Sequence, residues 1–234
     1  MTRLTSTMKW DVRLQWRNGF YYAAIVIVAT FLLIFSQISV ANMEWVLPFM
    51  LINNMIVGTF YFMGALVLLE KDEGSLEARV TTPLRPAEYL AAKTVTISGL
   101  ALLESVLIVM ITARFNANWL LLLAGIMGTA VLLCLAGFVV VVRYDSVNEY
   151  LLPSVLYVMA LCIPIVAYLF SWDHWLLYLH PMQASLTLLK GAWQPLPWQQ
   201  IVYGLGYSAL WIAWFSRLSL RTFHRFVITK PGVK

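Results

Sequence analysis

Apolar residues in this chain gather into six long runs separated by short polar or charged segments. A helix needs about 20 apolar residues to cross a hydrocarbon core about 30 Å thick. Runs of that length, bounded by charge, cover residues 20–38, 45–69, 91–113, 119–142, 150–170 and 198–216. Every backbone group inside a bilayer must be hydrogen-bonded within its own segment, so these runs predict helices. We therefore predict an all-α integral membrane protein with six transmembrane helices in one domain, residues 1–234.

The polar lead before the first run, residues 4–18, carries two competing patterns. A strand period of alternating apolar and polar positions is present at Met8, Trp10, Val12, Leu14 and Trp16. A helical period gives one apolar stripe and one basic stripe, at Leu4, Met8, Val12, Trp16 and at Lys9, Arg13, Arg17. An unpaired strand edge at a membrane surface is costly. We therefore predict an amphipathic interfacial helix, with tryptophans toward the lipid and basic side chains toward phosphate.

Residues 171–197, before the last run, are too apolar for free solution and are interrupted by proline and glycine at Pro181, Gly191, Pro195 and Pro197. This pattern predicts two short re-entrant helices that dip into or cap the outer leaflet, with tryptophans at headgroup depth. Asp173, His174 and His180 lie in this segment, but their spacing matches no helical zinc motif, so we predict no metal.

Composition and charge exclude a soluble domain and orient the chain. Hydrophobic residues make up 61% of the chain and charged residues 12%. Soluble globular domains contain fewer hydrophobic and more charged residues than this. Fourteen of the sixteen Lys and Arg residues fall on one predicted face, at Arg3, Lys9, Arg13, Arg17, Lys71, Arg79, Arg85, Lys93, Arg143, Arg217, Arg221, Arg225, Lys230 and Lys234. The positive-inside rule then places both termini in the cytoplasm. The net charge of +5 indicates topology rather than nucleic-acid binding.

Two smaller features have alternative interpretations. Residues 39–41, Ser-Val-Ala, could follow a signal peptide, but the apolar run before them is longer than a signal core, so we predict that the first span is retained. Cys134 and Cys162 lie inside apolar runs, where a thiol acts as a small buried hydrophobe.

Residues 70–93, EKDEGSLEARVTTPLRPAEYLAAK, form a mixed-charge loop between the second and third runs. A hairpin connection between helices needs only a few residues, so a loop of this length calls for an explanation. Its pattern predicts a short helix over residues 72–81, a break at Pro83, and a new helix opened by Pro86. The loop mixes positive and negative charges, which favours a surface that contacts protein over a lipid-binding patch, since such a patch would be basic. A solvated loop without a partner is the alternative.

This loop resembles the signature region of ABC type 2 export permeases. The elements that match are Glu70, Gly74, Leu76 and Glu77, then Thr82, Pro83 and Leu84, then Glu88, Tyr89, Leu90 and Lys93. The stretches KWDVRLQWRNGFYY, YLLPSVLYVMALCIPIV and YLHPMQASLTLLKGAW are similar to the fluoroquinolone-exporter-type permeases within that family.

The resemblance implies the transmembrane subunit of an ATP-driven exporter in the cytoplasmic membrane of a prokaryote. Two permease chains, identical or different, would form the pathway, and residues 70–90 would couple each one to a separate ABC ATPase that binds ATP and Mg. Residues 171–197 would form an outer gate. The chain has no G-x-x-x-x-G-K-[ST] phosphate loop, which agrees with a separate motor.

The resemblance and the span pattern together give three sets of candidate residues. ATPase coupling is expected at Glu70, Asp72, Glu73, Gly74, Leu76, Glu77 and Arg79. A smaller inner contact is expected at Arg143, Asp145, Asn148 and Glu149, with an ordinary tight loop as the alternative. Polar, aromatic and methionine residues inside spans are substrate-pathway candidates, namely Asn53, Asn54, Met55, Tyr61, Phe62 and Glu104. Helix–helix bonding is the alternative role for these six, including a pairing of Glu104 with Asn53 or Asn54.

Export of a hydrophobic or amphipathic substrate is the leading prediction of function, and two alternatives come from other classes. An intramembrane enzyme should show a catalytic set, yet the three histidines, His174, His180 and His224, lie in predicted loops and tail. A membrane scaffold without transport would leave the mixed-charge loop unexplained unless the loop binds another soluble partner. Co-purification with an ATPase would separate all three.

Overall fold

The computed structural model describes residues 3–37, 43–76, 84–112 and 117–228. These residues form a helical bundle, and no strand occurs among them. The first half contains α1 (Arg3–Arg17), α2 (Phe20–Ser36), α3 (Met43–Met55), the π-helical η2 (Ile56–Tyr61), α4 (Phe62–Asp72) and α6 (Pro86–Thr112). The second half contains α7 (Trp119–Val141), α8 (Val147–Leu161), α9 (Ile163–Leu169), η3 (Trp175–Leu179), α10 (Pro181–Lys190), α11 (Trp198–Phe223) and η4 (His224–Ile228).

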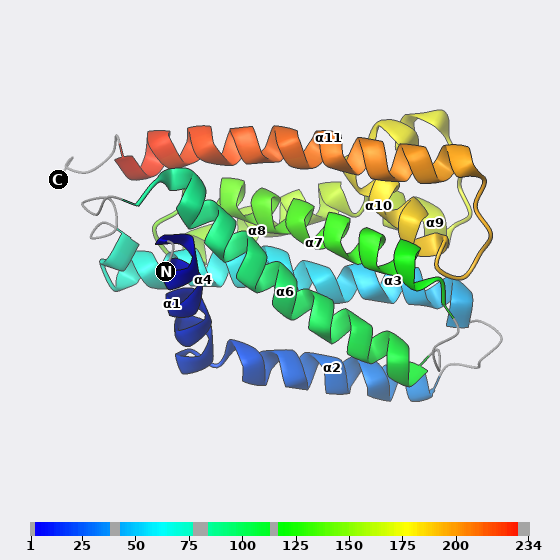
Figure 1. The fold of residues 1–234 in the computed structure, drawn as a ribbon, viewed down its shortest axis with the longest axis horizontal. Helices are drawn as coiled ribbons and strands as arrows, with labels where there is room; N and C mark the ends of the chain where they lie inside the picture. The colour runs from blue at the N-terminus through cyan, green and yellow to red at the C-terminus, as the bar shows by residue number, and fades with distance from the viewer. Residues whose placement is uncertain (1–2, 38–42, 77–83, 113–116, 229–234) are drawn as a thin grey trace.

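The bundle has two distinct ends (Figure 1). One end gathers α1, the end of α4, the start of α6 and the end of α11. The other end holds α9, α10 and the start of α11. The buried α7 runs between them and contacts α11, α10, α6, η2 and α4. The end that contains α1 is called the inner end below, because it carries the residues that the charge pattern assigns to the cytoplasm.

Three helices are long and apolar enough to cross a membrane: Trp45–Asp72, Pro86–Thr112 and Trp119–Val141. Two bent pairs raise the number of candidate spans among the described residues to five, α1 with α2 at 64° and α8 with α9 at 52°. The predicted run 198–216 is helical and extends to Phe223 as α11, but its many Tyr, Trp, Gly and Ser residues leave it outside this set. The chain is a multi-pass membrane protein with three to five candidate spans, and six spans stay a prediction.

Two spans predicted as continuous helices are irregular. The second contains η2, where the helix widens by one residue per turn around Ile56–Tyr61. The predicted run 150–170 breaks between α8 and α9, because Pro164 lies in the first turn of a new helix that begins at Ile163, directly after Cys162. Both features depend on local backbone geometry that apolar runs do not reveal.

The N-terminal lead is a helix, as predicted, and not a strand. Trp10 and Trp16 are exposed, while Asp11 and Gln15 are fully buried on the side that faces α6. The polar face of α1 therefore packs on protein, which the apolar and basic stripes did not predict. Residues 39–41 lie outside the described residues.

The predicted outer segment does contain two short helices, η3 and α10. His174 accepts a hydrogen bond from the Leu176 amide and caps η3. His180 caps α10, since its Nδ1 accepts from the Met182 amide at 3.2 Å, and its Nε2 lies 3.0 Å from the carbonyl oxygen of Ala160. Burial lowers the pKa of the His180 imidazole, which favours the neutral ring that these two contacts require.

Three glycines of α7 lie where neighbouring elements pack against this helix. A Cβ at Gly125 would lie 2.9 Å from the Leu189 side chain, and one at Gly128 would lie 3.6 Å from the Ser185 hydroxyl. Gly137 lies against the backbone of Phe60 in η2. Small residues thus let α7 approach α10 and the π-helical segment.

Candidate functional site

A buried cluster of charges joins three helices at the inner end of the bundle. Glu70, in the last turn of α4, has no exposed surface. Its carboxylate accepts hydrogen bonds from the Tyr89 hydroxyl at 2.7 Å and from the Lys93 ammonium at 2.9 Å, both on α6. Charge-assisted bonds of this length are the strong class of protein hydrogen bond. They fix the end of α4 to α6.

The same ammonium also reaches α1. Lys93 Nζ lies 3.5 Å from Asp11 Oδ1, and both side chains are fully buried. One cation is therefore shared by two carboxylates, one from α1 and one from α4. Next to this contact, the Gln15 amide donates to the Thr96 hydroxyl at 3.0 Å. We name Asp11, Glu70, Tyr89 and Lys93 the anchor cluster.

Aromatic rings close the anchor cluster on its apolar side. The Tyr89 ring lies 5.3 Å from Phe223 of α11 and 6.4 Å from Phe138 of α7, between ring centroids. These contacts exclude water from the charges, which strengthens their attraction and raises the cost of removing one of them. Five helices thus meet at this point.

Lys71, one residue beyond Glu70, joins α4 to the loop between α7 and α8. Its ammonium donates to the carbonyls of Val142 at 2.9 Å and Tyr144 at 2.6 Å. It also lies 3.2 Å from the Asp145 carboxylate. A cation at the last carbonyls of a helix is favourable, because those groups have no partner within the helix. The two predicted inner contact regions therefore lie side by side.

Replacing Lys71 by methionine should loosen that loop. The change removes the donor to two carbonyls, and amide hydrogen exchange of residues 143–146 should rise roughly tenfold. Hydrogen exchange followed by mass spectrometry measures this directly. Lys9→Met, the same change at an exposed position of α1, is the control and should leave the loop unchanged. Equal exchange in the Lys71 variant and the wild type would show that the loop does not depend on this contact.

The predicted coupling residues divide into buried and exposed groups. Glu70 and Leu76 are buried, while Asp72, Glu73 and Gly74 are exposed. The predicted continuous helix 72–81 is wrong at its start: α4 ends at Asp72 and Gly74 adopts a φ of 66°, a left-handed conformation that suits glycine at a helix end. Helical structure resumes at residues 75–76. Glu77 and Arg79 lie outside the described residues.

The four predicted secondary contacts, Arg143, Asp145, Asn148 and Glu149, are all exposed. Together with Asp72, Glu73 and Gly74 they form what we call the inner surface. Glu73 in turn pairs with Arg17 at the end of α1, at 2.7 Å, in a bridge that is largely exposed. Exposed pairs of this kind contribute little to stability, so the anchor cluster and Lys71 hold the inner surface in place.

Four of the six predicted pathway residues are buried, and Asn53 and Tyr61 are half-buried. Asn54 donates to Glu104 at 3.4 Å, the pairing offered as the structural alternative, and both side chains are buried. A Cβ on Gly58 in η2 would lie 3.0 Å from Glu104 Oε2, so glycine lets this carboxyl pack closely against η2. Asn53 donates to the Phe49 carbonyl in its own helix, and Met55 is buried. The rings of Tyr61 and Phe62 pack against Tyr150 of α8 and Phe20 of α2.

Sequence reasoning missed the role of Asp11 and Lys93 in the anchor cluster. Asp11 is the one acidic residue of the basic N-terminal lead. A lone carboxylate in such a segment could have indicated that Asp11 pairs with a buried cation. Lys93 entered only as part of a family motif. The sequence predicted the start of this helix correctly. α6 begins at Pro86, and the Glu88 carboxylate in its first turn accepts a hydrogen bond from the Arg85 amide at 3.0 Å.

The chain matches a family model over residues 2–231, and the model describes the Fluoroquinolones export permease protein family. It is 32% identical over 237 residues to the fluoroquinolones export permease protein of Mycobacterium tuberculosis strain CDC 1551 / Oshkosh, and that alignment covers all of both chains. The protein of the same description in strain H37Rv is similar to the same extent. This confirms the resemblance to ABC type 2 export permeases and makes the chain a transporter subunit rather than an enzyme. The chain belongs to the Fluoroquinolones export permease protein family.

Proposed function

We propose that the chain is the transmembrane subunit of an ATP-driven exporter that moves amphipathic, drug-like molecules out of the cytoplasm or inner leaflet. Its relatives are named for fluoroquinolones, and this supports a cargo of that class. ATP and Mg would bind to a separate ABC ATPase. A second permease chain, identical or different, would complete the pathway in the cytoplasmic membrane.

The observation that carries the proposal is the direct link between the two parts of the inner surface through Lys71. A motor that closes on ATP can move membrane helices only if its contact surface is firmly attached to them. Asp72 and Glu73 follow directly on α4, Asp145 is held by Lys71, and the anchor cluster fastens α4 to α1 and α6. A push on this surface would therefore reach several helices at once.

Capture of the ATPase by the purified permease tests this proposal. Glu70 is buried, so its variants report on folding, and the test belongs at the exposed Asp72 and Glu73. The double variant Asp72→Asn/Glu73→Gln should lower capture roughly tenfold, as expected when contacts worth about 1.4 kcal/mol are lost. The insertion of the permease and its elution in size-exclusion chromatography should not change.

The matched control is Gln199→Lys/Gln200→Lys, which adds the same two units of charge at the other end, near the start of α11. It should capture as much ATPase as the wild type. Undiminished capture by the Asp72/Glu73 variant would contradict the placement of the contact. A wild-type chain that captures no ABC ATPase from its own cells would contradict the function itself.

A further inference from the structure

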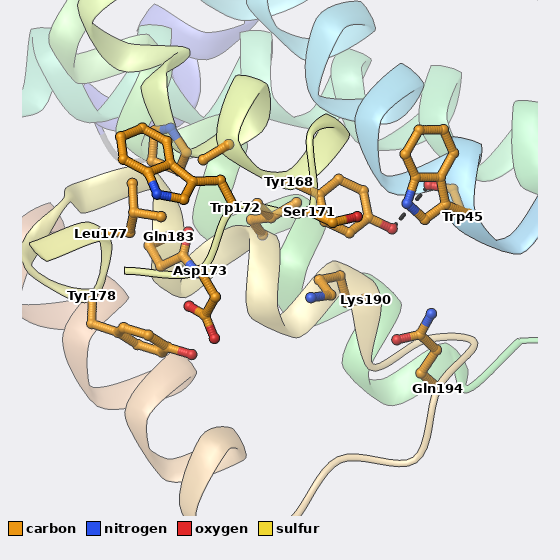
Figure 2. Close-up of a pocket in the computed structure, with 13 residues that line it drawn as sticks. Trp45, Tyr168, Ser171, Trp172, Asp173, Leu177, Tyr178, Gln183, Lys190 and Gln194 are labelled. Atoms are coloured by element: carbon orange, nitrogen blue, oxygen red, sulfur yellow. Dashed lines mark hydrogen bonds between the residues drawn. The ribbon is translucent and has the colours of Figure 1, made fainter. Parts of the chain in front are cut away.

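A cavity of about 320 Å³ opens at the end of the bundle opposite to the inner surface (Figure 2). It lies between α3, α9, α10 and the segment that leads into η3. Pockets that hold drug-sized molecules enclose roughly 300–1,000 Å³, so this one has room for a small drug. None of the six predicted pathway residues lines it.

Aromatic side chains build its walls. Trp45 and Tyr168 stack with ring centroids 5.8 Å apart, and the Tyr168 hydroxyl donates to the Trp45 carbonyl at 2.9 Å. These two contacts hold both rings in place across the gap between α3 and α9. Trp172 adds a third, more exposed ring. Fixed, flat apolar walls favour a planar aromatic ligand, since stacking needs little rearrangement of the protein.

Two opposite charges stand on separate sides of the cavity. Figure 2 shows Asp173 beside Tyr178 on one side and Lys190 beside Gln194 on the other. Neither charged group forms an ion pair within the described part of the chain, and the Lys190 ammonium instead lies over the Tyr168 ring, 4.9 Å from its centroid. Burial raises the pKa of the Tyr178 phenol, and the Asp173 carboxylate, which accepts its hydrogen bond, raises it further. Tyr178 therefore stays a neutral donor that orients Asp173.

Gln183 supplies an unused polar group in the same cavity lining. Its side-chain oxygen is buried and has no hydrogen-bond partner, although the residue lines the cavity. Buried polar atoms in native proteins are almost always hydrogen-bonded, so an open acceptor at a cavity wall indicates a donor on a bound molecule.

We propose that this cavity is an outward-facing binding site for a flat aromatic zwitterion, whose carboxylate pairs with Lys190 and whose ammonium pairs with Asp173. The inference rests on the proposed export function and adds a place where the cargo binds and the two side chains that recognise its charges. Two separated, unpaired charges across aromatic walls select for a molecule with opposite charges at its two ends. Fluoroquinolones that carry a ring carboxylate and a free amine have this form.

Binding of such a fluoroquinolone to the purified full-length chain tests the site, by quenching of tryptophan fluorescence and by calorimetry. Lys190→Gln and Asp173→Asn should each weaken binding about tenfold, because each removes one charge-assisted contact. Gln199→Glu changes the net charge by the same amount as Lys190→Gln, lies outside the cavity lining, and should bind as the wild type does.

Two modified drugs assign each charge to its partner. An ester of the ring carboxylate should bind the wild type and Lys190→Gln equally, since the group that meets Lys190 is gone. An N-acetylated drug should likewise be insensitive to Asp173→Asn. The exchange Asp173→Lys/Lys190→Glu should restore binding of the zwitterion by turning it end for end. This pattern cannot come from misfolding, which would weaken all three ligands together.

Two outcomes separate this inference from the proposed function. If the wild type binds and exports the drug while both cavity variants bind it equally well, the inference fails and the export function stands. A wild-type complex that neither binds nor exports the drug would contradict both.

Discussion

Replacement of Lys93 by methionine is expected to destabilise the fold by about 3–5 kcal/mol, the cost of removing one partner of a buried ion pair. Lys93 is fully buried and is the cation that Asp11 and Glu70 share, at 3.5 and 2.9 Å. Without it, Asp11 and Glu70 would each lose a buried partner in a site closed by Tyr89 and Phe223. Methionine fills a similar volume, so the loss would come from charge rather than from a cavity.

Thermal unfolding of the purified chain in detergent measures this effect. Lys9→Met, an exposed position on α1, should stay within about 0.5 kcal/mol of the wild type. Glu70→Gln should cost less than Lys93→Met, since it removes one of two negative charges and leaves Asp11 paired with Lys93. A Lys93→Met chain as stable as the wild type would show that the anchor cluster does not hold α1, α4 and α6 together.

A single methyl group at Gly137 should have the second-largest effect. The Cβ of Gly137→Ala would lie 2.7 Å from the Phe60 carbonyl oxygen and 3.1 Å from the Phe60 Cα. Both atoms belong to the backbone, so no side-chain rotation can relieve the clash. Inserting a group into such packing costs about 1–3 kcal/mol, and α7 or the π-helical segment must move.

Gly99→Ala in α6 is the matched control, because a Cβ there meets no atom within 4 Å. Alanine is the better helix former by about 1 kcal/mol, so this variant should be as stable as the wild type or more so. The same unfolding measurement decides the comparison. Equal melting temperatures for the two variants would contradict the close contact between α7 and η2.

The sequence predicted the helices well where a helix is regular and apolar. Length and hydrophobicity were enough for α2, α6 and α7, whose bounds agree with the prediction to within a few residues, and Pro86 marked the start of α6 ahead of its apolar run. They were not enough for η2 or for the bend before Pro164, because a widened or broken helix has the same apolar composition as a straight one. The sixth span, α11, stays a prediction, since it falls outside the set of helices that are long and apolar enough to cross a membrane.

The candidate site was predicted in part. The charged loop pointed to the inner end, and the structure brings that loop and residues 143–149 together through Lys71. Glu70, however, is a buried anchor rather than a surface contact. A sequence shows that a carboxylate follows a span, but its burial depends on Asp11 and Lys93, which are distant in the chain and meet it only in the folded bundle.

We propose that Asp72 and its neighbours form a cytoplasmic surface that a separate ATPase covers. Thiol labelling tests it most directly, with a single cysteine at position 72 in a chain in which Cys134 and Cys162 are replaced by alanine. We predict that a membrane-impermeant reagent labels this cysteine in inverted vesicles and not in right-side-out ones, and that bound ATPase protects it. Labelling from outside the cell, or equal labelling with and without the ATPase, would contradict the account.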